Sequence, residues 1–181
     1  MNSFDFAVKA YNEGAVFAAF DIETTGLDPR QNKIVELGAV KFDNRGLIAR
    51  FSTLINPGIP MPEEAARVNN ISDEMLKDKP PLDEVMPDFL SFTKGAVLAA
   101  HNAPFDCGFI NENLGKALPN PIVDTLAVSK ELFPGLRSYS LQNLAAALGI
   151  NALDAHRAED DSRLCMEIFL HCVESAKKPG F

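Results

Sequence analysis

An apolar run from Ala15 to Ile22 (AVFAAFDI) is the feature that most constrains the fold. Because the run is short and is ended by Glu-Thr-Thr-Gly, its pattern is typical of a buried strand. Residues 33–42 and 47–55 predict two further strands, and Asp43 to Gly46 (DNRG) is a turn signal between them. Three strands joined by short links predict an antiparallel meander.

The rest of the chain predicts helices that alternate with short strands. Helices are expected near 63–68 and 82–93, over 104–114, from 124–125, from Ser140 to before Gly149, and over about 158–176; short strands are expected at 96–100 and 122–123. This order predicts an α/β fold in which a mixed sheet combines the meander with parallel strands and is flanked by helices. We expect one domain over 1–181, with a core of about 14–176, an arm or short helix at 1–13 and a tail at 177–181.

Charge limits the kinds of partner. The chain has 17 Lys and Arg against 25 Asp and Glu, so its net charge is −8. A protein that coats nucleic acid through phosphate contacts is normally basic, so we expect no broad nucleic-acid surface. An acidic chain can still act on nucleic acid if bound cations supply positive charge. Three cysteines without a CxxC pair, no long apolar window and no signal-peptide pattern predict a soluble, cytoplasmic protein with no membrane contact.

The first strand carries two acids near its end. Asp21 and Glu23 are two residues apart, so strand alternation places both on one face, with Ile22 on the other. Two neighbouring carboxylates on a largely buried strand repel each other unless a cation neutralises them. Hard oxygen ligands suit Mg²⁺ or Mn²⁺. The alternative is a strand end at which both acids simply reach water.

A third acid, Asp106, lies in His101 to Asp106 (HNAPFD), at the start of the helix predicted over 104–114. Helical spacing aligns Asp106 with Phe109 and Ile110, so we expect its carboxylate to point inward. An acid in the first helical turn also interacts favourably with the helix dipole, which is the structural alternative. An exposed position would serve that role better, so the inward direction favours a site.

The last helix offers three neighbouring acids, and helical spacing distinguishes them. Asp161 falls on the apolar stripe, four residues before Cys165, whereas Glu159 and Asp160 fall toward solvent. Asp161 is therefore the inward carboxylate. His156 lies just before this helix, and an imidazole that titrates near neutrality is a suitable general base. The other histidines, His101 and His171, are expected to be structural.

Three segments resemble the motifs of a known enzyme family. Phe20 to Gly26 (FDIETTG), His101 to Asp106 (HNAPFD) and His156 to Asp161 (HRAEDD) are similar to the three exonuclease motifs of the DEDDh family. This DnaQ-like group includes the proofreading epsilon subunit of bacterial DNA polymerase III. The resemblance covers roughly residues 14–176. One departure is Val68 to Ser72 (VNNIS), which places Asn69 where many relatives carry His.

The resemblance implies a ribonuclease H-like fold and a metal-dependent 3′→5′ exonuclease that releases nucleoside monophosphates from single-stranded or frayed DNA. Its implied catalytic set is Asp21, Glu23, Asp106 and Asp161, which would hold two Mg²⁺ or Mn²⁺ ions, with His156 as general base. By the same analogy Thr24, Thr25, Gly26, Asn102 and Phe105 would seat the terminal nucleotide. A role in proofreading or repair follows, with DNA favoured over RNA and a DNA polymerase subunit as a candidate partner.

Two other functions compete with this one. An RNA-trimming exonuclease or oligoribonuclease would use the same catalytic set, because the chemistry does not involve the 2′-hydroxyl. A non-catalytic nucleic-acid-binding module would keep the fold but is expected to lack one of the four carboxylates or the histidine. All five side chains are present, which favours an enzyme.

Overall fold

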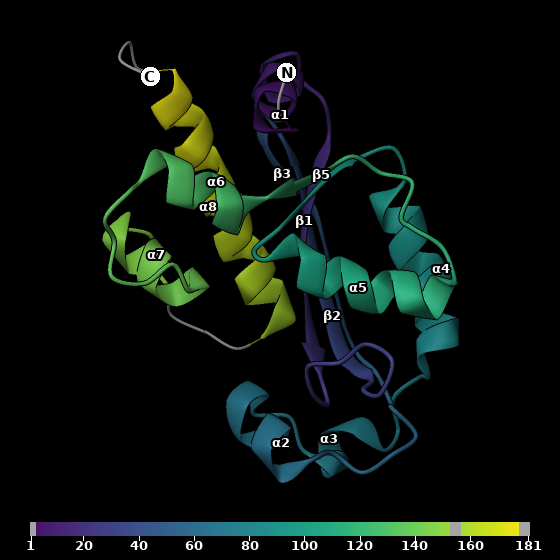
Figure 1. Ribbon diagram of the computed structural model, residues 1–181. Helices are drawn as coiled ribbons and strands as arrows, with labels where there is room; N and C mark the ends of the chain where they lie inside the picture. The colour runs from purple at the N-terminus through teal and green to yellow at the C-terminus, as the bar shows by residue number, and fades with distance from the viewer. Residues whose placement is uncertain (1–2, 153–156, 178–181) are drawn as a thin grey trace.

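The central element is a five-stranded mixed sheet. In the computed structural model, which describes residues 3–152 and 157–177, the strand order is β3-β2-β1-β4-β5 (Figure 1). The strands are β1 (Phe17–Thr24), β2 (Ile34–Asp43), β3 (Gly46–Leu54), β4 (Val97–Ala100) and β5 (Ile122–Asp124). Neighbours are antiparallel from β3 to β1 and parallel from β1 to β5. The predicted meander and mixed sheet are confirmed.

Eight helices are found in the described part of the chain: α1 (Ser3–Asn12), α2 (Glu63–Asn69), α3 (Asp73–Leu76), α4 (Leu82–Thr93), α5 (Ala103–Leu114), α6 (Thr125–Leu132), α7 (Leu141–Ala147) and α8 (Ala158–Ala176). The short helix α3 was not predicted from the sequence, because four residues carry no helical period. Ser140 precedes α7 as expected, but its hydroxyl makes no cap hydrogen bond and accepts one from the Asn143 amide at 2.7 Å instead.

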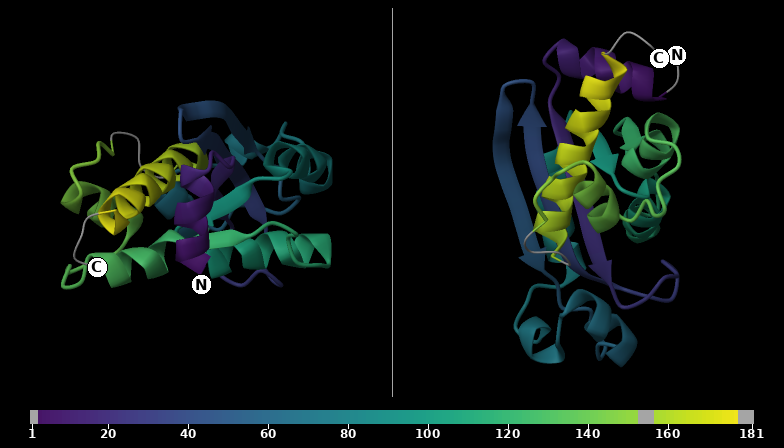
Figure 2. Two further views of the ribbon diagram at one scale, coloured as in Figure 1. Left: turned by 90° about the horizontal axis from the view of Figure 1, so that it is seen from above. Right: turned by 90° about the vertical axis from the view of Figure 1, so that its left-hand side faces the viewer.

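Helices cover both faces of the sheet. Strand alternation sends Phe17 and Ala19 of β1 into a core with α1, α6, α7 and α8, and sends Ala18 and Phe20 into a second core with α4 and α5. Figures 1 and 2 show α8 lying along one face of the sheet, with α4 and α5 on the other. Because Asp21 has the same parity as Phe17, its side chain emerges on the α8 face.

The strands differ in length, and this difference exposes one edge of β1. β4 pairs with β1 only from Phe17↔Val97 to Ala19↔Ala99, whereas β2 accompanies β1 to its end. On the β4 side, the final residues of β1 therefore face the start of α5 instead of a neighbouring strand. Beyond this end lie α2 and α3, whose apolar side chains contact Val35 of β2.

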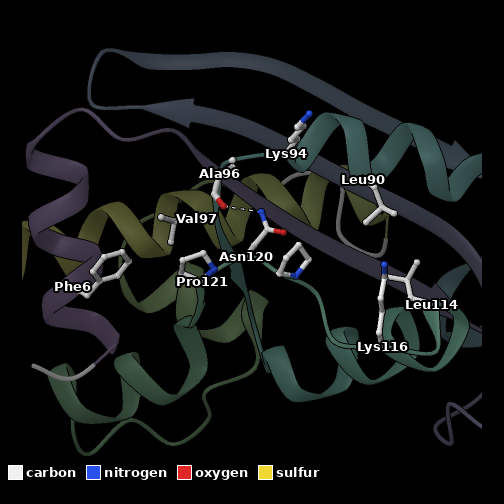
Figure 3. A pocket seen from close by; sticks show the side chains of 11 residues that line it. Phe6, Leu90, Lys94, Ala96, Val97, Leu114, Lys116, Asn120 and Pro121 are labelled. Atoms are coloured by element: carbon white, nitrogen blue, oxygen red, sulfur yellow. Dashed lines mark hydrogen bonds between the residues drawn. The ribbon is translucent and has the colours of Figure 1, made fainter.

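A groove of about 510 Å³ lies at the opposite end of the sheet from the end of β1 (Figure 3). Phe6, Leu90 and Leu114 contribute to its lining, with Lys94 and Lys116 also at its wall. It contains none of the acids singled out in the sequence, so it has no part in the predicted chemistry. Among the described residues, no helix has the length and apolar content that crossing a bilayer requires.

Candidate active site

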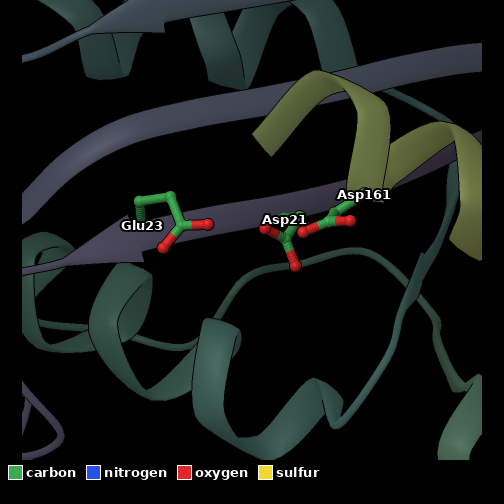
Figure 4. Close-up of side chains that lie close together, drawn as sticks. All are labelled: Asp21, Glu23 and Asp161. Carbon is green, nitrogen blue, oxygen red and sulfur yellow. The ribbon is translucent and has the colours of Figure 1, made fainter. Parts of the chain in front are cut away.

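Three of the four predicted carboxylates meet at the end of β1. Asp21, Glu23 and Asp161 each place one carboxylate oxygen within 4.8 Å of the others. Figure 4 shows the two β1 side chains and the one from α8 pointing toward one another. Asp161 is 6% exposed, whereas Glu159 turns away to an ion pair with Arg50 at 2.8 Å. Helical spacing thus identified the buried acid among three neighbours.

The fourth carboxylate approaches from the other side of β1. Asp106 is 3% exposed, and its Oδ1 accepts a hydrogen bond from the Ile22 backbone N–H at 3.3 Å. That amide lies beyond the last pairing of β1 with β4, so the carboxylate takes the place of a strand partner. The prediction that Asp106 points inward is confirmed.

Burial and mutual crowding of these acids shift their pKa values upward. Burial, followed by the charges of Asp161 and Glu36, raises the pKa of Glu23 to about 7. Burial raises the pKa of Asp106 to about 8, although backbone hydrogen bonds oppose the shift. For Asp21 burial is again the main cause, and the nearby carboxylates add to it, so its pKa lies well above the usual range. Such a cluster gains stability from bound divalent cations, and its hard oxygen donors fit Mg²⁺ or Mn²⁺.

Neighbouring polar groups hold Asp161 in place. The Gln142 amide of α7 donates to Asp161 Oδ1 at 3.2 Å. The Asp161 backbone N–H donates to the Arg157 carbonyl at 2.9 Å, which closes the first turn of α8. Hydrogen bonds to an acid of this kind orient its oxygens before a ligand arrives.

A single carboxylate, that of Asp124, organises the chain before Asp106. Asp124 Oδ1 accepts hydrogen bonds from the backbone N–H groups of Asn102, Ala103 and Leu126, at 3.0, 3.4 and 3.1 Å. Asn102 has a φ of 77°, a left-handed conformation that a non-glycine residue rarely adopts without support. Asp124 therefore fixes both the tight entry into α5 and the start of α6.

The turn after β1 is held by hydrogen bonds within itself. The Thr24 hydroxyl donates to the Gly26 carbonyl at 2.7 Å, and Thr25 Oγ1 accepts from the Lys33 N–H at 2.9 Å. A Cβ on Gly26 would lie 2.3 Å from Asn32 Oδ1. The absence of a side chain at Gly26 thus makes room for the Asn32 side chain.

A pocket of about 390 Å³ opens beside the carboxylates. Its lining includes Glu23 and four of the residues predicted to seat a nucleotide, namely Thr24, Thr25, Gly26 and Phe105. Leu27 and Val68, which are 83% and 65% exposed, add apolar surface at its wall. The pocket therefore joins a largely apolar surface to the acidic cluster.

Asn69 also lines this pocket, but its side chain forms hydrogen bonds within the protein. It is 2% exposed, its amide donates to the Thr24 carbonyl at 3.3 Å, and its Oδ1 accepts from the Ile71 N–H at 3.2 Å. A hydrogen bond from Asn69 also favours the charged form of Glu23 and so lowers its pKa against the larger effect of burial. Asn69 thus ties α2 to the end of β1.

The two remaining predicted residues are a substrate contact, which does not line the pocket, and the general base. Asn102 is exposed and contributes its backbone to the Asp124 interaction. His156 lies outside the described residues, so its place relative to the acids is not part of the structure. His101 is structural as predicted: its ring nitrogens lie 3.0 Å from Thr125 Oγ1 and 2.8 Å from the Tyr139 carbonyl, and burial lowers its pKa.

Sequence reasoning missed the supporting residues around the acids, which are Glu36, Asn69, Asp124, Gln142 and Arg157. Glu36 carried a detectable signal, because it is a lone acid in the middle of an apolar strand (KIVELGAV). A charge at such a position is rarely buried unless it is paired. Its partner could not be read from the sequence, since Arg157 lies 121 residues away.

The chain matches known exonucleases over most of its length. The family model RNase_T, described as an exonuclease, matches residues 18–169. The DNA polymerase III subunit epsilon of Treponema pallidum (strain Nichols) is 46% identical over 95% of this chain and 88% of that protein. A DNA polymerase III of PolC type from Caldanaerobacter subterraneus subsp. tengcongensis is 41% identical over 91% of this chain, which spans only 12% of that protein.

Solved structures agree with the sequence matches. Exonuclease X in complex with 5′ overhanging duplex DNA aligns with a TM-score of 0.73 and 25% identity, over 89% of this chain and 92% of that one. The nuclease domain of 3′hExo, described as a DEDDh family member bound to rAMP, aligns with a TM-score of 0.75 over 89% of this chain and 92% of that one. At 16% identity this second likeness concerns the fold alone. These findings confirm the resemblance drawn from the three motifs and the expected ribonuclease H-like fold. The chain belongs to the RNase_T exonuclease family.

Proposed function

We propose that this protein is a metal-dependent 3′→5′ exonuclease that shortens single-stranded or frayed DNA and releases nucleoside monophosphates, in proofreading or repair. The observation that carries the proposal is the convergence of Asp21, Glu23 and Asp161, with oxygens within 4.8 Å of one another, beside a pocket large enough for a nucleotide. Family membership supports exonuclease chemistry, and the relatives named as DNA polymerase III subunits support a role in replication.

Each acidic side chain has a role in this proposal. Asp21, Glu23, Asp106 and Asp161 would hold two divalent cations, Mg²⁺ or Mn²⁺, which when bound would activate a water molecule and stabilise the leaving oxygen. His156 accepts the proton of the attacking water. Water oxygen forms the new bond to phosphorus, the bond from phosphorus to the 3′-oxygen of the preceding nucleotide breaks, and that oxygen is protonated from solvent.

The adjacent pocket would seat the terminal nucleotide. The half-buried Phe105 ring offers an apolar face, and Thr24, Thr25 and Gly26 form the wall nearest Glu23. Apolar contact with a base tolerates any sequence, as an exonuclease requires. Asn102 would also contact the substrate, because it is exposed at the entry to α5.

The proposed setting is the bacterial replication or repair machinery in the cytoplasm, with a DNA polymerase subunit as a candidate partner. The three cysteines are free and buried, and burial raises their pKa values, which suits a reducing compartment. The net charge of −8 disfavours a long phosphate-binding track. We therefore expect an enzyme that holds a few nucleotides at a strand end.

The test is degradation of matched oligomers with Mg²⁺ or Mn²⁺: single-stranded DNA, single-stranded RNA of the same sequence, and duplexes with paired or mismatched 3′ ends. We expect monophosphates from the 3′ end of DNA, faster from mismatched than from paired ends. Cleavage of RNA alone would replace the proofreading role with RNA trimming.

The site assignment has its own test. Asp21→Ala and His156→Ala should each lower the rate by several orders of magnitude with the fold intact. Glu112→Gln, an exposed substitution on α5, is the control and should retain wild-type activity. Wild-type-like cleavage by Asp21→Ala would show that the acidic cluster is not the catalytic centre.

A further inference from the structure

The start of α8 rests directly on β2, in close backbone contact at Gly38. A Cβ on Gly38 would lie 2.2 Å from the Ala158 carbonyl carbon and 2.3 Å from the Glu159 nitrogen, so any side chain there would displace the helix. In the strand register Gly38 is paired with Asp21. The helix therefore touches β2 beside one of the acids that β1 carries.

Two residues earlier on β2, Glu36 binds the same helix through its side chain. Glu36 is 1% exposed and is paired with Glu23 across the strands. Its carboxylate accepts from Arg157 Nη2 at 2.7 Å and Nε at 3.0 Å, and from the Ala158 backbone N–H at 3.2 Å. One carboxylate thus holds both a guanidinium fork and a free amide at the helix N-terminus.

These contacts lead by a short path to the acidic cluster. The Arg157 carbonyl accepts the Asp161 backbone N–H at 2.9 Å, so the residue that Glu36 holds also closes the turn that carries Asp161. Any movement of Arg157 is therefore passed to Asp161.

We propose that Glu36, Gly38 and Arg157 form a positioning device, called here the α8 seat, which sets the placement of Asp161 against the two carboxylates of β1. The proposal rests on the proposed function. None of the three residues carries a predicted catalytic role, and none belongs to the three exonuclease motifs except Arg157. The seat acts through Asp161 and is not required to touch substrate.

Geometry explains why such a device is needed. The four acids come from three separate elements, and only β1 supplies two of them. A metal site requires its ligands to be held within about 0.5 Å of the productive geometry. The seat couples α8 to the register of β2, and β2 is hydrogen-bonded to β1 along its whole length. The seat thereby fixes the position of α8, which carries Asp161, relative to β1, which carries Asp21 and Glu23.

A second ion pair on the same helical turn provides a matched control. Arg50 of β3 binds Glu159 at 2.8 Å, with side chains 49% and 29% exposed. This pair also joins the first turn of α8 to the sheet, but it bonds neither the helix amides nor the residue that holds Asp161. Arg50→Ala therefore removes a surface ion pair without touching the seat.

The experiment compares Arg157→Ala, Arg157→Lys, Glu36→Gln and Arg50→Ala in the full chain. Substrate-free protein is titrated with Mn²⁺ by calorimetry, and kcat and KM are measured on single-stranded DNA. We expect Arg157→Ala to weaken Mn²⁺ binding and to lower kcat by about 10- to 100-fold, with KM within about threefold of wild type. Arg157→Lys keeps the charge without the two-nitrogen fork and should recover part of the loss. Arg50→Ala should match wild type in both measurements.

The outcomes separate this proposal from the proposed function. If wild-type protein binds Mn²⁺ but degrades no oligomer, the function fails and the calorimetry still tests the seat. If Arg157→Ala does not fold, Glu36→Gln and Arg157→Lys supply the same comparison. Wild-type kcat and Mn²⁺ affinity in these variants, or equal losses in Arg50→Ala, would overturn the seat.

Discussion

Replacing one buried carboxylate of the acidic cluster should stabilise the metal-free protein and remove most of the stabilisation that bound metal provides. Glu23 is suited to the test, because burial and neighbouring charges raise its pKa from 4.5 to about 7. A group with a folded-state pKa above its unfolded value contributes stability below the unfolded pKa. That contribution is lost as pH rises through the folded value. For Glu23 the loss therefore falls between about pH 4.5 and 7.

The size of the effect follows from the shift. One pKa unit corresponds to about 1.4 kcal/mol, so at pH 8 the charged Glu23 costs the folded metal-free protein about 3 kcal/mol. At pH 5 most of this cost is absent, because the folded carboxyl is protonated. Glu23→Gln keeps the shape and an acceptor for Asn69 but removes the charge. We expect the variant to exceed wild type by about 3 kcal/mol at pH 8 and by less than about 1 kcal/mol at pH 5.

The assay is urea unfolding in EDTA at pH 5 and pH 8, repeated at pH 8 with Mn²⁺. Metal that binds only the folded state stabilises wild type, and the variant, which lacks a ligand, should gain much less. The order of stability should therefore reverse when metal is added. Glu112→Gln, the same chemical change at an exposed site on α5, should stay within about 0.5 kcal/mol of wild type throughout. If Glu23→Gln is no more stable than wild type at pH 8 in EDTA, the argument from burial and charge crowding fails.

Three further substitutions probe how the site is built. Asp106→Asn should abolish exonuclease activity and, in EDTA at pH 8, raise the melting temperature above that of wild type, because the amide oxygen can still accept from the Ile22 N–H while the buried charge is removed; loss of folding would contradict this. Asp124→Ala leaves three backbone amides without their acceptor and should lower the free energy of unfolding by about 2–3 kcal/mol in urea. Gly38→Ala forces α8 from β2 and should cost about 1–3 kcal/mol and most of the activity; a wild-type rate would contradict the contact.

Local pattern was sufficient to predict most elements and the direction of the acids. Alternation along β1 put Asp21 and Glu23 on one face, and the helical period put Asp161, rather than Glu159 or Asp160, on the buried side of α8. Both predictions depend on backbone geometry over a few residues, which any strand or helix shares. Four-residue α3 lies below the length at which such a period can be read.

The surroundings of the acids could not be predicted in the same way. Asp124 is an ordinary helix N-cap by sequence, and its two further bonds to the entry of α5 depend on β5 lying beside β4. In the sequence Asn69 is visible only as a departure from the family motif, whereas in the structure it is buried against the end of β1. These roles arise from neighbours that only the folded chain supplies.

By itself the sequence determined the acids, the order of the elements and the faces on which they lie, because periodicity and motif spacing are local properties of the chain. Only the tertiary structure decided that β1 extends beyond its pairing with β4, so that the Asp106 carboxylate can accept a hydrogen bond from the Ile22 amide. It also decided that Glu36 pairs with Arg157, which lies 121 residues away in the sequence. Strand order and helix docking result from packing the whole core. The distances between the acids depend on that packing. These distances in turn determine whether the acids can share a metal ion.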